Sequence, residues 1–465
     1  MNTFSDSFWY FFSVLANSHK MKYLFIFLFL FSFFKNTAQN PNKLWTDALE
    51  TRYSVLQPVT DYVLTIDSAD LSYFSVDMHL LHVPDTFKVA MVAHPEYDDH
   101  YYRYVSDFTV KSKNGPGEIK RMDSAVWEVI GRSDEVFLHY KIVLPPQRST
   151  MRAAWRPFLS PTGGLVGGPH SFMYVVGKTL APSHVQFRIP AGWQIATGLQ
   201  PTADPGIYFA PSVFVLTDCP ALLGKIHTWP FLVGAVPHRI VYCCAQNASR
   251  IDSAELVHSV SLIVKEAAEL FGRLPYREYS FLLQENAYGA LEHSNSVTLG
   301  IESGENSVNL NRYLEEIGHE YFHAWNIVRI HPQEYGDVAY HTPPYSTGLW
   351  WSEGLTMFYA DLLLRRAGLP PEDSSRKKHL EHLLERYYDN PGNLVFSAEK
   401  VSLSAYAPNG MLGDYFASTH LQGELLGAMM DLIIRDKTMN RLSIDDVIDV
   451  SIVFRMSMVR KQERR

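Results

Sequence analysis

The sequence predicts an α+β protein of two parts, an all-β N-terminal domain followed by a mainly α domain. The chain has 465 residues, more than one core needs, since domains average roughly 150 residues. Short apolar stretches between Pro and Gly fill residues 41–238, whereas residues 239–460 carry apolar side chains at helical spacing. We therefore place the domain boundary at residue 238.

Residues 1–38 have the composition of a secretory signal peptide. Lys22 precedes an almost entirely apolar run, 23–34, after which the chain turns polar. The run is shorter than the roughly 20 residues that span a bilayer. We predict removal of the signal near Ala38, no transmembrane segment afterwards, and a periplasmic, cell-envelope or extracellular location. Met21 is an alternative start, because it directly precedes this signal.

The N-terminal domain is predicted from strand-like segments. Apolar residues alternate or cluster over 62–66, 73–80, 136–143 and 185–189. Cysteines add little, because Cys219, Cys243 and Cys244 are the only three and one of them cannot pair within the chain. Their spacing does not suit a zinc-thiolate site, which leaves buried thiols or one disulfide of Cys219.

The second domain is predicted from helical periodicity. Residues 254–271 repeat apolar side chains at helical spacing and end before Gly272. Further helices are predicted at 310–328, 352–367, 375–388 and 420–435, with one strand at 277–284. A net charge of -8 and a pI of about 6.2 provide no basic surface for phosphate backbones, so we expect no nucleic-acid partner.

The strongest local motif is His319-Glu320-Tyr321-Phe322-His323. On a helix, the two histidines four residues apart project from one face and can bind one metal ion. Glu320 flanks that face, where it can act as a general base toward water. Because the pattern also arises by chance, the alternative is a helix whose histidines merely share a polar face.

A catalytic zinc takes three protein ligands, and Glu353 is the candidate for the third. It stands in the first turn of the helix predicted at 352–367, with Ser352 as the expected N-cap. The alternative for Glu353 is a surface residue favoured there by the helix dipole. The predicted cofactor is one Zn²⁺ ion.

Several segments resemble the glycyl aminopeptidase family of zinc metallopeptidases. They are the motif at 319–323 with Ala324-Trp325-Asn326, then Arg329-Ile330 and Pro332, Trp351-Ser352-Glu353-Gly354, 361–364, Gly289-Ala290-Leu291-Glu292-His293-Ser294, 271–275, and Asp218, Pro220 and Gly224 with 190–197. The resemblance spans roughly residues 45–450. It implies a thermolysin-like catalytic domain after the β domain and places the family's third metal ligand at Glu353.

The resemblance also implies substrate-binding residues. In related aminopeptidases a Gly-x-x-Glu motif contains the glutamate that binds the substrate's free α-amine. Gly289 and Glu292 match that motif here. The alternative for Glu292 is an exposed loop carboxylate. Trp325 and Asn326 are expected near the metal-binding histidines, with a core position for Trp325.

The chain departs from the family pattern twice. Where the family has Tyr-x-Lys-Gly, with the tyrosine stabilising the tetrahedral intermediate, this chain has His420-Leu421-Gln422-Gly423. His420 either replaces the tyrosine as a catalytic hydrogen-bond donor or is a structural residue in an impaired site. Family members also commonly carry a C-terminal PDZ-like domain, which we expect this chain to lack, because only about 15 residues follow Val450.

The sequence thus predicts a zinc aminopeptidase acting on peptides with small N-terminal residues, glycine or alanine. Two alternatives stay open: a zinc endopeptidase, for which Glu292 would be irrelevant, and a catalytically impaired, peptide-binding homologue.

Overall fold

The structure is a computed structural model of the chain. It describes residues 59–92, 100–145, 152–243, 251–301, 310–332, 335, 341–342, 346–369, 375–404 and 417–448, all within the compact unit Leu56–Arg465. The predicted signal region, 1–38, and the alternative start at Met21 lie outside the described residues and stay predictions. In the part of the chain that is described, no helix has the length and apolar character needed to cross a membrane.

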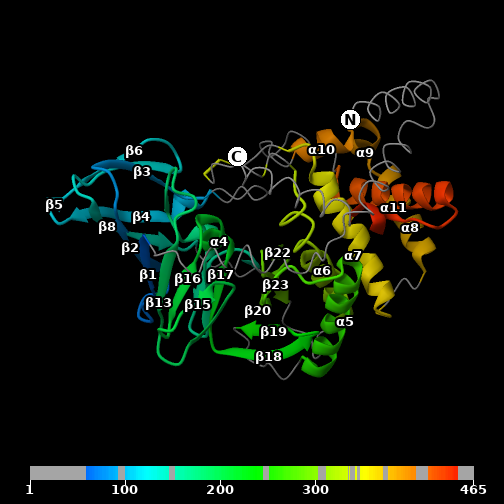
Figure 1. Ribbon diagram of the computed structural model, residues 1–465, viewed down its shortest axis with the longest axis horizontal. Helices are drawn as coiled ribbons and strands as arrows, with labels where there is room; N and C mark the ends of the chain where they lie inside the picture. Colours follow the sequence, from blue (N-terminus) through cyan, green and yellow to red (C-terminus); the bar gives the residue numbers. More distant parts are fainter. Residues whose placement is uncertain are drawn as a thin grey trace, which may run out of the picture. The chain divides into compact units, whose positions relative to one another are not determined.

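The N-terminal part contains an eight-stranded sheet with the order β15-β16-β13-β1-β2-β8-β4-β5 (Figure 1). Every second side chain of β1 (Thr60–Thr65) and β2 (Tyr73–Leu81) is buried, as the period of a strand requires. The other members are β4 (Val105–Ser112), β5 (Gly115–Pro116), β8 (Glu135–Val143), β13 (Ser183–Arg188), β15 (Gln200–Pro201) and β16 (Ile207–Ala210). The four predicted strands are confirmed as β1, β2, β8 and β13.

Two four-stranded sheets complete the β region, with the orders β10-β11-β17-β14 and β12-β3-β7-β6. Their strands are β3 (Thr86–Ala90), β6 (Glu118–Arg121), β7 (Val126–Ile130), β10 (Phe158–Ser160), β11 (Gly163–Gly167), β12 (Tyr174–Val175), β14 (Gln194–Thr197) and β17 (Pro220–Gly224). Short helices η2 (Tyr101–Tyr104), η3 (Gly168–His170) and α4 (Val213–Asp218) connect them. The apolar faces of β1, β2 and β8 form the core of this part.

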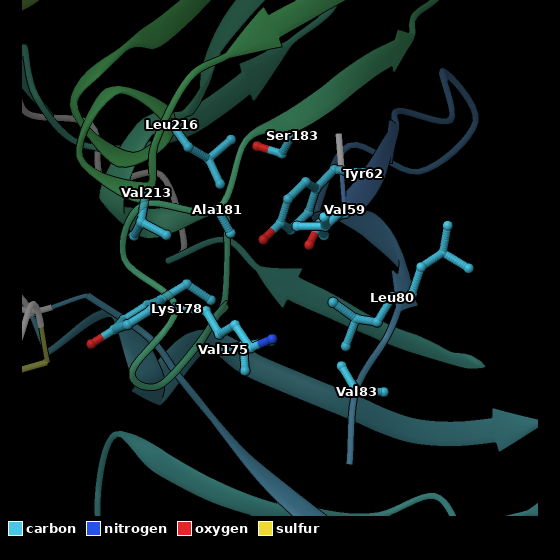
Figure 2. A pocket seen from close by; sticks show the side chains of 13 residues that line it. Val59, Tyr62, Leu80, Val83, Val175, Lys178, Ala181, Ser183, Val213 and Leu216 are labelled. Atoms are coloured by element: carbon cyan, nitrogen blue, oxygen red, sulfur yellow. The ribbon is translucent and has the colours of Figure 1, made fainter. Parts of the chain in front are cut away.

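A small apolar cavity lies inside the β region (Figure 2). Tyr62, Lys178 and Ser183 are among the residues that line it. Its lining contains none of the predicted site residues. Near the same core, Cys219 is buried and free, so the alternative of a Cys219 disulfide is wrong. Cys243 is disulfide-bonded.

A five-stranded sheet with the order β18-β19-β20-β23-β22 follows. Its strands are β18 (Ile226–Val233), β19 (Val236–Cys243), β20 (Tyr279–Glu285), β22 (Ala290–Glu292) and β23 (Ser296–Ile301). The strand predicted at 277–284 is β20, while β22 and β23 were not predicted. The boundary predicted at residue 238 lies inside β19, which pairs with both β18 and β20.

Helices make up the rest of the second part, which confirms the predicted fold class. They are α5 (Ser253–Phe271), α6 (Leu310–Phe322), the π-helical turn η6 (Trp350–Gly354), α7 (Leu355–Arg366), α8 (Arg376–Tyr388), α9 (Pro391–Val395), α10 (Ala398–Ser404) and α11 (Thr419–Thr438). Asp252 caps α5 by accepting from two backbone N–H groups, and Gly272 ends it with φ of 68°.

Buried charges link three of these helices. The carboxylate of Asp361 in α7 is 1% exposed and accepts from Arg365 and from Arg376, which begins α8. On α11, Glu424 accepts from His379 Nε2 of α8 at 2.6 Å. Each buried carboxylate has a charged or hydrogen-bonding partner, which offsets the cost of removing its charge from water. These contacts connect α8 to α7 and to α11.

Candidate active site

The two motif histidines lie at the end of α6. His319 is within the helix, and His323 is the first residue after it, with its N–H 3.4 Å from the carbonyl of His319. The prediction that this helix runs to residue 328 is wrong, because tight turns replace it after Phe322 and Ile327 has φ of 112°. His319 and His323 are still neighbours although the helix ends early. Their rings are perpendicular, with centroids 4.7 Å apart.

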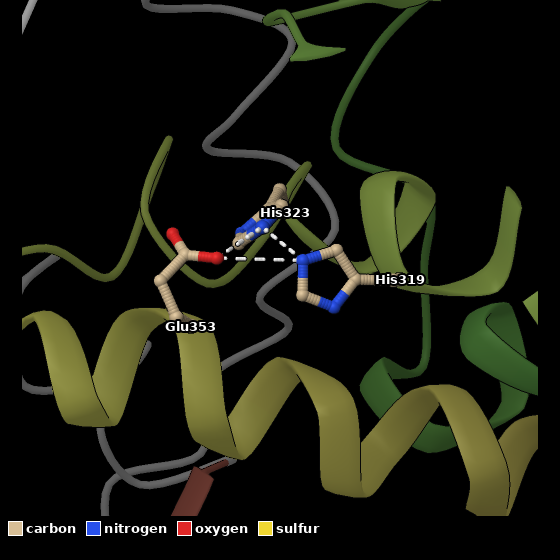
Figure 3. A group of neighbouring side chains, drawn as sticks. All are labelled: His319, His323 and Glu353. Carbon is tan, nitrogen blue, oxygen red and sulfur yellow. Dashed lines mark hydrogen bonds and ion pairs between the residues drawn. The ribbon is translucent and has the colours of Figure 1, made fainter. Parts of the chain in front are cut away.

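Glu353 meets both histidines, as Figure 3 shows. Its Oε2 lies 3.4 Å from Nε2 of His319 and 3.5 Å from Nε2 of His323. The two Nε2 atoms are 3.1 Å apart. The carboxylate comes from η6 rather than from a capped first turn. The expected Ser352 cap is wrong, because the helix begins earlier, at Trp350, and its start has no side-chain cap.

The three donors fit a metal ion. Donors at zinc-ligand bond lengths in a tetrahedral site lie about 3.3–3.4 Å from one another. All three side chains are at most 9% exposed. Burial lowers the pKa of His319 to about 4, which favours the neutral, ligating imidazole. Burial opposes ionisation of Glu353, but His323 and hydrogen bonds from the histidines outweigh it and hold its pKa well below its usual range.

Asn326 contacts two members of this cluster, the side chain of His323 and the backbone before Glu353, and so orients them. Its backbone carbonyl accepts from His323 Nδ1 at 2.8 Å, which directs Nε2 toward the other donors. Its amide Nδ2 donates to the carbonyls of Trp351 and Ser352, the two residues directly before Glu353, at 3.1 and 3.0 Å. The expected position of Asn326 near the histidines is thus observed. Trp325 stacks on Phe271 in the core.

Two further carboxylates face the cluster. Ligand atoms of Glu292, Glu320 and His323 all lie within 4.8 Å of one another. Burial raises the pKa of Glu320. His323 lowers it by a smaller amount, and the negative charges of Glu292 and Glu353 raise it further. Burial is also the main reason that the pKa of Glu292 is raised. The structure therefore places Glu292, at the end of edge strand β22, close to Glu320, the candidate general base.

Gly289 lies outside this cluster, at the turn between β21 (Ala287–Tyr288) and β22. It has φ of 68°, and a Cβ on it would approach the ring of Trp155 to 2.7 Å. The neighbouring strand β21 pairs with β9 (Arg152–Ala153) of the β region. Only glycine fits this left-handed, closely packed turn, which sets the start of β22.

His420 points at the cluster from α11. Its Nε2 is 3.1 Å from Oε2 of Glu353, and its ring stacks on that of His319 with centroids 5.6 Å apart. The side chain is 48% exposed. A donor at this position is close to Oε2 of Glu353 and is still open to solvent.

Two glycines bring α11 close to η6. A Cβ on Gly423 would lie 1.9 Å from the carbonyl oxygen of Trp350, and a Cβ on Gly354 would lie 2.1 Å from the Cα of Gly423. The backbones of η6 and α11 are in contact here. This contact brings Glu353 of η6 within reach of His420 of α11.

We expect Gly423→Ala to destabilise the fold by about 1–3 kcal/mol, because its methyl group overlaps backbone that cannot move aside. The matched control is Gly427→Ala, one turn later, whose Cβ would meet side chains rather than backbone, at 3.2 Å from Cδ1 of Leu355 and 3.3 Å from Cβ of Phe358. Its stability should change by less than about 1 kcal/mol. Chemical denaturation of both variants measures the difference, and equal stabilities would contradict the contact.

Comparisons with known proteins agree with this geometry. A model described as M61 glycyl aminopeptidase matches residues 312–425, which include both histidines and Glu353. A model of the peptidase M61 N-terminal domain matches residues 61–225. Together they cover more than half of the chain. The chain belongs to the M61 glycyl aminopeptidase family. It is therefore a hydrolase of the metallopeptidase class.

Solved structures share the fold of this M61 member. An aminopeptidase N family protein from Idiomarina loihiensis is 22% identical, with a TM-score of 0.75 over 84% of this chain and 70% of that chain. An M1 zinc metallopeptidase from Deinococcus radiodurans is 15% identical, with a TM-score of 0.51 over 85% of each chain. A variant of the latter, bound to a Tyr-Ser-Ala substrate, has a TM-score of 0.51 at 14% identity. No curated protein matches.

Sequence reasoning missed several residues around the site. Asp218 and Arg329 had no predicted role, yet both contact the segment after Glu292. Trp155 was not considered, although it packs on Gly289. Asp218 and Arg329 stand among the segments that resemble the family, but no local pattern assigns them a role, because each contacts a segment distant in the sequence.

Proposed function

We propose that this metallopeptidase is a zinc aminopeptidase that releases glycine or alanine from the N-termini of peptides. The observation that supports it most is the carboxylate of Glu292 within 4.8 Å of both Glu320 and His323. A carboxylate at that distance can bind a substrate's α-amine while the first peptide bond lies at the metal-binding cluster. The preference for small residues is supported by the family to which the chain belongs.

One zinc ion, held by His319, His323 and Glu353, would supply a Lewis acid that activates water near neutral pH. Burial raises the pKa of the Glu320 carboxyl group. Glu320 takes a proton from the attacking water and returns it to the leaving amine. Glu292 fixes the α-amine. His420 replaces the family tyrosine by donating a hydrogen bond to the oxygen that becomes negative. Peptides are the substrates, and we propose that the enzyme acts after export from the cytoplasm.

Glu292→Gln removes the charge that binds the amine and keeps the shape of the side chain. We expect kcat/KM for Gly- and Ala-terminated peptides to fall by about 10²-fold, as expected for losing a charge-assisted contact. Peptides with an acetylated N-terminus should be cleaved no more slowly than before. Rates on paired free and acetylated substrates, with zinc content, measure this.

The matched control is Glu278→Gln, an exposed glutamate in the segment that precedes β20. Unchanged release of glycine and alanine by Glu292→Gln, with zinc retained, would favour the endopeptidase alternative. Absence of turnover in the wild-type enzyme on the whole panel would favour the peptide-binding homologue.

A further inference from the structure

The segment that follows Glu292 is held by an acidic residue of the β region. Asp218 ends α4, and its Oδ2 accepts the backbone N–H of Ser294 at 2.8 Å. Its other oxygen lies 3.6 Å from Nδ1 of His293, whose side chain is 6% exposed. The carboxylate stays ionised, since His293 and Ser294 outweigh the effect of burial and lower its pKa. Asp218 thus clamps the two residues directly after Glu292.

A second charged side chain, Arg329, contacts the same segment at the carbonyl of Ser294. Its Nη1 and Nη2 each lie 3.2 Å from the carbonyl oxygen of Ser294. Nη1 also donates to the carbonyl of Ala324, the residue after His323, and Nη2 donates to Pro275 at 2.9 Å. Burial lowers the pKa of Arg329 to about 10, so the guanidinium remains charged near neutral pH. One planar group therefore joins the backbone beside His323 to the backbone beyond Glu292.

These contacts form a continuous chain from Asp218 through Ser294 and Arg329 to Ala324. Glu292 lies two residues before Ser294, and His323 lies one residue before Ala324. In an aminopeptidase the α-amine and the first carbonyl carbon are separated by a single Cα, so the distance between their two binding groups has little tolerance. A misplacement of about 1 Å can reduce the rate by about 10²-fold.

We propose that Asp218 and Arg329 are positioning residues that set the distance between the amine-binding carboxylate of Glu292 and the metal-binding His323. They thereby restrict cleavage to the first peptide bond. The inference rests on the proposed role of Glu292. It adds the residues that hold Glu292 at the distance from His323 that this role requires. It also gives the β region a part in substrate selection, because Asp218 comes from α4.

The test compares Arg329→Lys and Asp218→Asn with the wild type. Lysine keeps the charge but cannot contact Ser294, Ala324 and Pro275 together, because it lacks the planar fork. Asparagine keeps the shape of Asp218 but loses its charge. The matched control is Arg239→Lys. Arg239 also crosses to the β region, donating to Thr197 O at 3.0 Å and to Ser280 Oγ at 2.8 Å, and touches neither Ser294 nor Ala324.

Each variant is assayed on Gly- and Ala-terminated peptides with free and acetylated N-termini, together with zinc content and melting temperature. For Arg329→Lys and Asp218→Asn we expect zinc to be retained and the preference for free N-termini to fall at least 10-fold, whereas Arg239→Lys keeps the wild-type preference. Because the preference is a ratio of two rates on one enzyme sample, partial unfolding cancels from it.

An unchanged preference in both variants, with rates on all substrates falling together, overturns the inference and leaves the proposed function intact. A wild-type enzyme without preference for free N-termini overturns the proposed function, and the inference with it.

Discussion

Glu320→Gln is expected to lower kcat by about 10²–10⁴-fold, the range that loss of a general base produces. The amide has nearly the same shape as the carboxylate but cannot accept the proton of the attacking water. Glu320 lies beside the metal-binding cluster without being one of its three closest donors, so zinc content should not change. Initial rates on Gly- and Ala-terminated peptides, and metal analysis of the same samples, measure the two effects.

Glu381→Gln is the matched control, because this glutamate is 56% exposed on α8 and pairs only with Lys377 among the described residues. It should have the wild-type rate. Equal rates for the wild type and Glu320→Gln would contradict the catalytic mechanism proposed for the site, since Glu320 is the residue to which the proposal assigns that proton.

His319→Ala is expected to abolish both metal binding and activity. It removes one of three buried donors, whose Nε2 lies 3.1 Å from that of His323. Loss of an outer hydrogen-bond partner weakens metal binding by roughly 10–100-fold, and loss of a direct ligand should weaken it by more than about 100-fold. Competition with a chelator measures the affinity independently of turnover.

His258→Ala is the control for that experiment, because His258 lies on α5 and is not one of the residues of the cluster. Its zinc content and activity should match the wild type. Full zinc retention by His319→Ala would show that the ion binds elsewhere and would remove the basis for the assignments of His323 and Glu353.

Much of the fold was accessible from the sequence because it depends on local periodicity. Strands β1 and β2 alternate buried and less buried residues over their whole length. Helix α5 has an apolar face, an Asp252 cap and a terminal Gly272 within one short segment. Strand β22 escaped prediction because it has only three residues, and β23 because all six of its residues are buried, so it lacks the alternation that marks a strand.

The group of His319, His323 and Glu353 was also predictable from the sequence, for a related reason. His319 and His323 are four residues apart, a spacing that sets their geometry before any tertiary contact forms. Glu353 was predicted from its position and from the family resemblance, and the structure places its Oε2 within 3.5 Å of both histidines. The local reason offered for it was wrong, since Glu353 stands in a π-helical turn rather than behind a Ser352 cap.

The sequence by itself determined the two-part fold class, the pairing of His319 with His323 and the family, because these depend on spacing within short segments. Only the tertiary structure decided which distant residues complete the site. It placed His420 on Glu353 through the Gly354–Gly423 contact, and Asp218 and Arg329 on Ser294. These contacts join residues 35 to 76 positions apart in the sequence, and their partners are mostly backbone atoms, which leave no pattern in the order of side chains.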